Sequence, residues 1–470
     1  MVILPAVSAV LPAAFGATAE YGAVRQITFG AYHHVLTNAN VWSPDGNRIV
    51  YDLRSPGRFD GERIEDVDVL SGNRRILYQS RNGAHCGVAT YCPTRERIVF
   101  ILGPENPTPD WSYGFSRRRG VVVATDAPSE IRPLDAMNYR PPFAPGALRG
   151  GSHLHVFSPD GKWVSFTYDD ELLARLDASS TTAGHEPNQR NIGIAVPWGP
   201  VQVAKNFPRN HDGDWFSVLV TRTAANPKPG SEEISRASEE AWVGTAGYIR
   251  VDGVRQERAL AFHGEVMAAD GSKHIEAFIV DLPADLTREG SAPLAGTLTT
   301  RPAPPPGVSQ RRLTHTNQSR YPGLASAPRH WLRSNPDGSA IAFLQKDDAG
   351  VVQLWTISPN GGTGRQVTKN SHDIASSFTW SPDGQFIAHV MDGSVCVTEV
   401  PTGTTTRLTD PEAKEVPLPT ACVFSPDGNL ICYSAMSVTG EVSYTQIFIV
   451  HVPRSGRARE LVPHRSGSKS

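Results

Sequence analysis

The sequence predicts an all-β fold, a seven-bladed β-propeller of four-stranded antiparallel blades. The main observation is a repeated Ser-Pro-Asp-Gly turn or a close variant, at residues 43–46, 158–161, 335–338, 381–384 and 425–428. In such a turn proline sets φ, aspartate bonds its own backbone and glycine supplies a positive φ. Each turn separates two short apolar runs, which is the pattern of a β-hairpin. The turn recurs about every 45 residues over much of the chain, the length of one propeller blade.

The first four blades follow from these turns in order. Residues 43–46 and 158–161 mark the first and third blades, and a degenerate turn at residues 92–95 marks the second. The long interval before residue 335 must hold a fourth blade, with strands at residues 215–221, 258–262 and 275–281. Within it, residues 231–242 combine a serine cap, early acids and helix formers, which predicts a short helical insertion in blade four. We place this insertion at about residues 223–257.

The last three blades carry regular turns, and a proline-rich loop at about residues 296–309 precedes them. The sequence leaves two ways for the ring to close. Residues 457–462 could form the last outer strand, or residues 26–28 could pair into the final blade. In both cases residues 25–470 form one domain.

Residues 1–24 are expected to be an N-terminal extension outside that domain. They are apolar and end in small residues like a signal peptide, but two prolines interrupt them and no basic residue precedes Arg25. We expect a cytoplasmic protein, with periplasmic or secreted as the alternative. The net charge of −2 gives no reason to expect nucleic acid, and no membrane partner is expected. The five cysteines lack any CxxC pair and are expected to be buried thiols, while Arg117–Arg119 are expected to be a solvated strand end.

The pattern Gln-Ile-Thr, followed by Trp-Ser-Pro-Asp-Gly at residues 42–46, resembles the TolB-like, WD40-like propeller repeat. Over the whole chain the resemblance is closest to uncharacterised bacterial members with Gly-Gly-Ser-His-x-His-Val-Phe-Ser-Pro, here residues 150–159. It implies the fold. It also implies a function, that of a non-catalytic propeller that binds a protein or peptide partner across its channel.

Six histidines lie shortly before the turns, where the inner strand of each blade begins and lines the central channel. They are His34, His85, His153, His155, His330 and His372. Strand alternation predicts that His153 and His155 share one face. With His85 from the preceding blade they could hold a divalent metal, and imidazole ligands suit manganese, iron, nickel or zinc. The alternative is that these rings form hydrogen bonds between blades.

The order His34, His85, His153, His155 is similar to the site of oligogalacturonate lyases, which are seven-bladed propellers with a catalytic histidine and metal-binding histidines. Residues 26–46 also resemble the first blade of that family. This resemblance implies a metal, with manganese as the first choice, and β-elimination on short uronic-acid-containing oligosaccharides. Two departures stand out. The family has a glutamine three residues before its His-x-His pair, where this chain has Gly150, and its pair lies later in the chain.

Such a reaction needs a base and positive charge near the carboxylate of the sugar. We expect His34 as the base, with His330 second, and Arg149 and Arg329 as the cations, although both arginines could form structural ion pairs. Trp111 and Tyr113 are expected to stack on a sugar ring, unless they pack between blades. Asn38 is the first-blade counterpart of His153 and is expected to contact substrate. The predicted function is therefore a metal-dependent, lyase-like enzyme, with the partner-binding propeller as the alternative.

Overall fold

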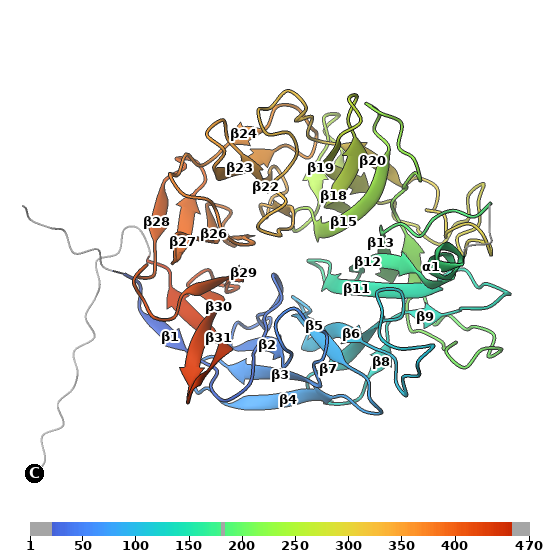
Figure 1. The fold of residues 1–470 in the computed structure, drawn as a ribbon, viewed down its shortest axis with the longest axis horizontal. Helices are drawn as coiled ribbons and strands as arrows, with labels where there is room; N and C mark the ends of the chain where they lie inside the picture. The colour runs from blue at the N-terminus through green and yellow to red at the C-terminus, as the bar shows by residue number, and fades with distance from the viewer. Residues whose placement is uncertain (1–20, 180–183, 454–470) are drawn as a thin grey trace, which may run out of the picture.

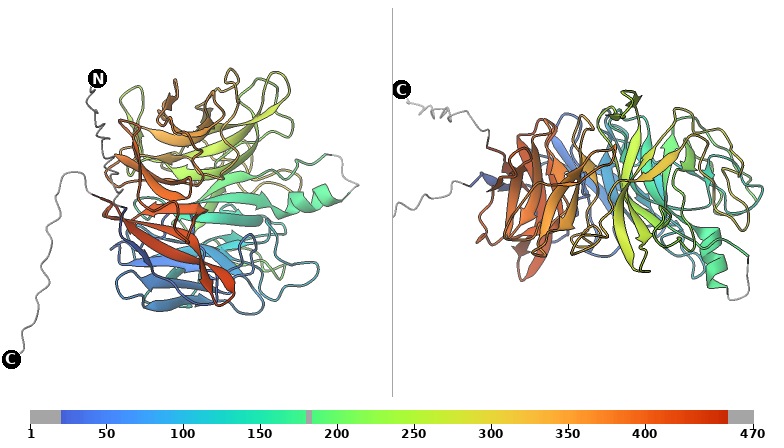
Figure 2. Two further views of the ribbon diagram at one scale, coloured as in Figure 1. Left: turned by 60° about the vertical axis from the view of Figure 1, so that its left-hand side comes forward. Right: turned by 90° about the horizontal axis from the view of Figure 1, so that it is seen from above.

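The computed structural model describes residues 21–179 and 184–453, which form seven β-sheets around a central channel (Figure 1). The seven-bladed fold class is confirmed. Each sheet runs outward from an inner strand at the channel, and the ring is a flat disc when seen from the side (Figure 2). Residues 1–20 of the predicted N-terminal segment (residues 1–24) and the possible strand at residues 457–462 lie outside the described residues. The bound at residue 24 is corrected, because Gly22 and Ala23 form backbone hydrogen bonds with Leu408 and His451, and Val24 begins a strand of the ring.

The first three blades occupy residues 35–219. Blade one contains β2 (Arg48–Asp52), β3 (Arg63–Asp68) and β4 (Arg74–Gln79), and isolated bridges at Val35 and Trp42 mark its inner strand. Blade two contains β5 (Cys86–Tyr91), β6 (Arg97–Leu102), β7 (Arg119–Ala124) and β8 (Arg132–Pro133). Blade three contains β11 (Gly150–Phe157), β12 (Val164–Asp170), β13 (Asn191–Val196) and β14 (Phe216–Leu219), and a two-stranded parallel ribbon of β9 (Ala136–Met137) and β10 (Ala147–Leu148) precedes it.

The remaining blades follow the same order. Blade four contains β15 (Ile234–Trp242), β18 (Ala259–Met267), β19 (Lys273–Asp281) and β20 (Ser309–Arg312), with a hairpin of β16 (Tyr248–Ile249) and β17 (Arg255–Gln256) inserted. Blade five contains β21 (Arg333–Ser334), β22 (Ile341–Lys346), β23 (Val352–Ile357) and β24 (Arg365–Gln366). Blade six contains β25 (Thr379–Trp380), β26 (Phe386–Met391), β27 (Ser394–Glu399) and β28 (Thr405–Arg407).

Blade seven closes the ring with strands from both ends of the chain. Its inner strands are β29 (Pro417–Phe424), β30 (Leu430–Thr439) and β31 (Val442–His451), and β1 (Val24–Gln26) adds the outermost strand. Gln26 pairs with Phe448 across an antiparallel ladder. Of the two closures that the sequence left open, the pairing of the N-terminal strand into the last blade is therefore the one that forms.

Two local predictions in the fourth interval are corrected. Residues 231–242 do not form a helix, because residues 234–242 are β15, the innermost strand of blade four. The helix propensity of these side chains is overridden by tertiary structure, since the strand pairs along its length with β18. The short helix is instead α1 (Glu171–Ala178), capped by Asp170. The predicted inner strand at residues 215–221 contains β14, the outer strand of blade three.

The repeated turns join the blades as well as their strands. In the first, Ser43 Oγ donates to Asp45 Oδ1 at 2.6 Å, and Gly46 has a φ of 73°. Tryptophans beside the turns reach the next sheet. Nε1 of Trp42 donates to Val423 O at 3.0 Å, and Nε1 of Trp380 donates to Arg333 O at 2.8 Å. These bonds connect blade one with blade seven and blade six with blade five, in addition to the apolar contacts between sheets.

The apolar core lies between successive sheets. All five cysteines are buried free thiols, as predicted. No helix within the described residues has both the length and the hydrophobicity that crossing a membrane requires.

Candidate functional site

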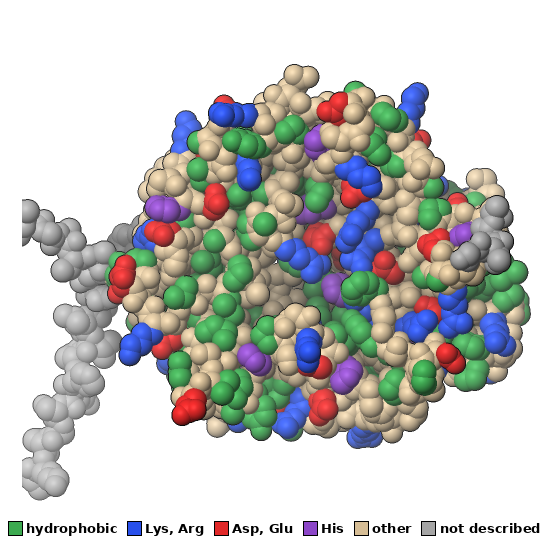
Figure 3. Space-filling model, in the orientation of Figure 1, with side chains coloured by type: hydrophobic (Ala, Val, Ile, Leu, Met, Phe, Trp, Pro, Cys, Tyr) green, Lys and Arg blue, Asp and Glu red, His purple; other side chains and the backbone are tan. Residues whose placement is uncertain are grey.

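A cavity of about 590 Å³ opens where the inner strands begin, at the end of the channel opposite the repeated turns. Two neighbouring cavities of about 670 and 310 Å³ share Arg329 with it, so the three form one elongated recess. In Figure 3, Lys and Arg side chains gather beside the central depression of this face. We call this recess the arginine pocket. The residues used below to describe it are Asn38, Arg54, Phe59, Tyr113, Phe115, Arg118, His153, Asp169, Arg190, Glu239, Arg329 and Trp331.

His153 on β11 and Arg118, just before β7, are neighbours in this pocket. The backbone N–H of Ser152 donates to Arg118 O at 3.1 Å, which holds the two segments side by side. Nδ1 of His153 lies 3.4 Å from Thr167 Oγ1, and no hydrogen bond within the described residues involves its Nε2. Burial, and then the positive charges of Arg118, Arg329 and Arg190, hold the pKa of His153 well below its usual value. His153 is therefore neutral at physiological pH.

Arg118 differs from Arg54, Arg190 and Arg329 of the pocket because it has no carboxylate partner in the described residues. Only 3% of this residue is exposed, and its Nη1 donates to Tyr113 Oη at 3.2 Å. Its Nε has no partner in the described part of the chain, and no Asp or Glu oxygen there lies within 4.0 Å of the guanidinium. Burial lowers the pKa of Arg118. A buried, unpaired guanidinium of this kind favours an anionic ligand.

Three other arginines of the pocket, Arg54, Arg190 and Arg329, are neutralised locally. Nη2 of Arg329 lies 2.8 Å from Glu239 Oε1, and Nη2 of Arg190 lies 2.9 Å from Asp169 Oδ2. Arg54 is similarly paired with a buried aspartate of β2, at 3.0 Å. Arg58 and Arg236 also line the recess without an ion pair among the described residues, but both are exposed, so Arg118 is the buried arginine of the pocket that lacks a carboxylate partner there.

Aromatic rings form the walls around these charges. Phe59 and Tyr113 are stacked, with ring centroids 4.4 Å apart. The Arg118 guanidinium lies 5.1 Å from the Phe115 ring centre, and that of Arg329 lies 4.7 Å from the Trp331 ring centre. A recess with aromatic walls and a few charged groups has the character of a small-molecule site.

The predicted pairing of His153 and His155 on one face is wrong. The register of β11 against β12 shifts between His153 and Val156, and Leu154 has a φ of 53°. This β-bulge breaks the alternation of side chains. His153 and Leu154 line the pocket, whereas His155 is completely buried, with its Nε2 3.9 Å from Asp135 Oδ2.

His34 and His85 also lie away from the pocket lining. His34 is fully buried, its backbone N–H donates to Thr445 O of blade seven, and its ring lies 5.1 Å from that of Tyr51. Burial lowers the pKa of His34 to about 4. The backbone carbonyl of His85 accepts the N–H of Gly103, and its Nδ1 is buried without a partner among the described residues. Neither ring is placed to act beside His153.

Three further candidates have structural partners. Both ring nitrogens of His330 are engaged, Nδ1 with Pro328 O at 3.1 Å and Nε2 with the N–H of Leu344 at 3.2 Å. Arg149 is 1% exposed and forms a 2.8 Å ion pair with Asp170. Trp111 is 7% exposed and lies beside the guanidinium groups of three arginines in a separate cavity. In this arrangement Arg149 and Trp111 correspond to the structural alternatives considered for them.

The structure therefore brings together four of the predicted residues, His153, Arg329, Tyr113 and Asn38. It does not assemble the predicted metal ligands. In residues 21–179 and 184–453 no three side chains of His, Cys, Asp or Glu converge as a group that could hold a metal ion. The donor set thus does not fit the expected divalent metal.

Sequence reasoning missed Arg118, Arg190 and Glu239. Arg118 was seen only as the middle of a basic run, and Glu239 was placed in a helix. One signal was available for Arg118, since strand alternation puts the middle of three consecutive side chains on the face opposite to the other two. Here Arg117 pairs with Glu171, Arg119 pairs with Glu105, and Arg118 alone faces the channel.

Comparison with solved structures supports the fold. An oligogalacturonate lyase in complex with manganese matches 93% of this chain and 95% of its own, with a TM-score of 0.54 and 11% identity. An oligogalacturonate lyase from Vibrio parahaemolyticus matches 92% of this chain and 94% of its own, with a TM-score of 0.52 and 12% identity. A putative TolB from Agrobacterium tumefaciens gives a TM-score of 0.37 at 14% identity, over 83% of this chain and 98% of its own. The expected resemblance to oligogalacturonate lyases is confirmed, and at these identities it concerns the fold alone.

Sequence relatives are closer. Residues 85–211 match the family described as "Protein of unknown function (DUF3748)". The uncharacterized protein YidR of Escherichia coli strain K12 is 47% identical over 415 residues, which is 87% of this chain and 94% of YidR. At this identity and coverage, the chain belongs to the same protein family as YidR.

Proposed function

We propose that the arginine pocket binds a short oligosaccharide that contains uronic acid and cleaves it by β-elimination. The observation that carries the proposal is the placement of Arg118, buried without a carboxylate partner, beside the neutral ring of His153. The similarity in fold to oligogalacturonate lyases agrees with this choice but does not establish it.

In this reaction the carboxylate of the sugar would lie against Arg118, whose guanidinium can form two parallel hydrogen bonds with it. The proton on C5 is weakly acidic. When this proton leaves, Arg118 stabilises the negative charge that develops on the carboxylate. Phe115 and the stacked pair of Phe59 and Tyr113 offer apolar faces for the sugar rings. Binding and charge stabilisation therefore come from one group of side chains.

His153 is the proposed base. No hydrogen bond within the described residues involves its Nε2, which could take the C5 proton. As the bond from C4 to the leaving oxygen breaks, a C4–C5 double bond forms. The imidazolium is disfavoured by burial and three arginines, so it would readily return that proton to the departing oxygen. The reaction then needs no other reactant, and each proton is accounted for.

No step is assigned to a metal. His85, His153 and His155 do not meet, and the positive charge that the reaction needs is available from Arg118. This differs from the metal dependence that the lyase resemblance implied.

The test is the formation of an unsaturated uronide, followed by its ultraviolet absorbance with short oligouronides of several types. We expect His153→Ala to lower kcat by about 10²- to 10⁴-fold, the usual contribution of a general base. Arg118→Gln should lower kcat/KM by about tenfold or more, because it removes a hydrogen bond to a charged group. His372→Ala and Arg132→Gln are matched controls, since both residues are exposed and lie outside the pocket. The absence of product and of binding with every uronide would overturn the proposal.

The second candidate is a non-catalytic propeller that holds a protein or peptide partner. It is favoured by the largely apolar opening at the other end of the channel, described below. Binding of oligouronides without product formation would favour a binding role at the arginine pocket as well. A cytoplasmic location remains part of our proposal, and cell fractionation of the full chain would test it.

A further inference from the structure

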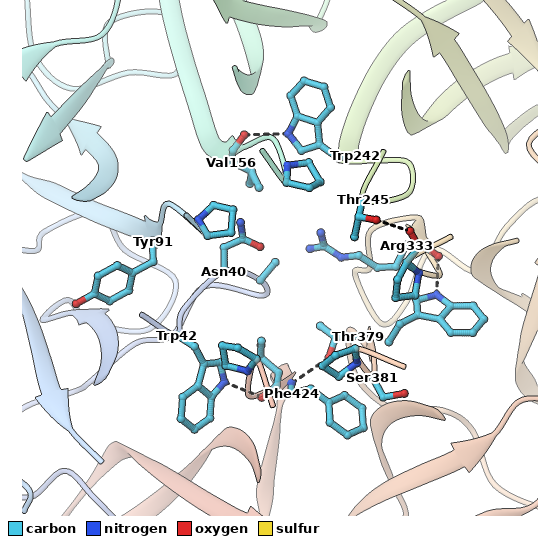
Figure 4. Close-up of a pocket in the computed structure, with 18 of the residues that line it drawn as sticks. Asn40, Trp42, Tyr91, Val156, Trp242, Thr245, Arg333, Thr379, Ser381 and Phe424 are labelled. Carbon is cyan, nitrogen blue, oxygen red and sulfur yellow. Dashed lines mark hydrogen bonds between the residues drawn. The ribbon is translucent and has the colours of Figure 1, made fainter. Parts of the chain in front are cut away.

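The repeated turns surround a second cavity, of about 370 Å³, at the opposite end of the channel (Figure 4). We call it the turn mouth. Six prolines of the turns line it: Pro44, Pro93, Pro159, Pro336, Pro382 and Pro426. Trp42, Trp242 and Trp380 complete the wall, and the indole nitrogen of each donates to a backbone carbonyl of the neighbouring blade. The wall is therefore rigid and mainly apolar.

Among the described residues that line this apolar ring, one is a cation. The guanidinium of Arg333, on β21, points toward the middle of the turn mouth (Figure 4). One of its nitrogens, Nη2, donates to Asn38 Oδ1, and its Nε has no partner among the described residues. Within that same part of the chain no carboxylate lies within 4.0 Å of it. A cation in an apolar ring without a counter-charge favours a bound anion.

Asn40 faces Arg333 across the turn mouth (Figure 4). Its backbone carbonyl accepts the N–H of Tyr91 at 2.6 Å, and its φ of 52° is one that asparagine tolerates better than most residues. No hydrogen bond engages its side-chain amide within the described residues. The side-chain amide of Asn40 is thus a second free donor, opposite the Arg333 guanidinium.

The nearby acid, Glu240, does not neutralise Arg333. Glu240 is 1% exposed, and neither of its carboxyl oxygens has a hydrogen-bond partner in the described segments. Burial raises the pKa of Glu240 well above its usual value, which favours the neutral carboxyl, and no oxygen of Glu240 lies within 4.0 Å of the Arg333 guanidinium. The positive charge of Arg333 therefore remains available to a ligand.

We infer that the turn mouth binds a ligand with one carboxylate on an apolar body. Arg333 and Asn40 hold the carboxylate from two sides, and the prolines and tryptophans of the turns contact the body. Charged hydrogen bonds of this kind are stronger than neutral ones, and a mostly apolar cavity of this size encloses a small molecule or a chain end. The same chemistry occurs in a free apolar acid and in the C-terminal carboxylate of an extended peptide.

Calorimetric titration of the full chain would use four probes. They are 3-phenylpropionate, its amide, an apolar tripeptide with a free C-terminus and the same tripeptide amidated. We expect at least one of the two acids to bind and its amide to bind at least about tenfold more weakly, since a charged hydrogen bond is lost. Binding of the free acid alone identifies a small ligand, and binding of the peptide acid identifies a chain end. Equal binding of acid and amide, or no binding of either acid, would overturn the inference.

Two variants locate the bound carboxylate. Arg333→Gln removes the cation, and Asn40→Asp keeps size and backbone tolerance while placing a carboxylate opposite Arg333. Each should weaken binding of the acid by about tenfold or more. Arg132→Gln, on the exposed outer edge, should bind like the parent. Unchanged affinity in both folded variants, with thermal unfolding as the check on folding, would contradict the assignment.

Discussion

Asp135 offers the sharpest test of the electrostatics around the candidate site. It lies between β8 and β9, is completely buried, and accepts hydrogen bonds from Ser152 Oγ at 2.9 Å and Ser217 Oγ at 2.7 Å. His155 lies 3.9 Å away, but burial lowers the pKa of that ring to about 3, so it supplies no positive charge. Burial raises the pKa of Asp135 to about 6. The ionised carboxylate should therefore destabilise the folded protein.

The magnitude follows from the shift in pKa. A rise in pKa from 3.8 to about 6 lowers the free energy of unfolding by about 3 kcal/mol at pH 7.5. At pH 5, where Asp135 of the folded protein is mostly protonated, the loss is about 1.5 kcal/mol. Because the pKa is raised in the folded state, the stability that the protonated carboxyl provides is fully present below pH 3.8 and is lost as the pH rises through 6. Asp135→Asn keeps the shape and removes the charge. Relative to the parent, the variant should thus gain about 1.5 kcal/mol between pH 5 and pH 7.5.

The assay is urea unfolding of both proteins at pH 5 and pH 7.5, followed by tryptophan fluorescence. Any constant loss from altered hydrogen bonds cancels in the difference between the two pH values. Asp212→Asn is a control, since Asp212 is an exposed partner of Lys205 and its pKa is already low. A stability difference between parent and Asp135→Asn that stays the same at both pH values would refute the reasoning.

Four further outcomes are expected. Asp66→Ala should destabilise the fold by about 3–5 kcal/mol in chemical unfolding, because it leaves two arginines that share this buried carboxylate without it. Trp42→Phe should cost about 1–3 kcal/mol in the same assay, since the buried carbonyl of Val423 loses its donor. Arg118→Gln should raise the pKa of His153, measured by NMR titration, without restoring its usual value, because burial is the larger cause. Treatment with a chelator should leave uronide cleavage unchanged, whereas loss of activity that added metal restores would contradict the assignment of charge stabilisation to Arg118.

The sequence was sufficient to predict the propeller because its strongest signals are local. A turn of Ser, Pro, Asp and Gly specifies its own geometry, so residues 43–46 could be read without knowing the rest of the chain. Blade four lacks such a turn, and there the prediction failed. Glu239 and Glu240 look like helix residues, but they lie in β15 because that strand pairs with β18. Ring closure was undecided for the same reason, since the pairing of Gln26 with Phe448 joins distant parts of the chain.

The candidate site was only partly predictable, because position along a strand does not determine where a side chain points. Counting back from the turns correctly placed His153, Asn38 and Arg329 at one end of the channel. The same count grouped His155 with them, and only the bulge at Leu154 shows why it points elsewhere. Arg118 comes from the outer part of blade two, so no spacing rule based on inner strands could have identified it.

The bulges themselves indicate which part of the ring is specialised. Val88, Leu154 and Glu239 occupy equivalent positions in β5, β11 and β15. Each lies three residues before the last paired residue of its strand, and each has a positive φ. Each position interrupts its ladder, and a side chain with a β-carbon in this conformation costs about 1–2 kcal/mol. All three residues line the arginine pocket. Strain of this kind persists where the surrounding structure enforces it, and bulges often re-aim side chains beside binding sites. Its repetition in three successive blades, on the side that holds His153, therefore supports placing the chemistry at this sector of the channel.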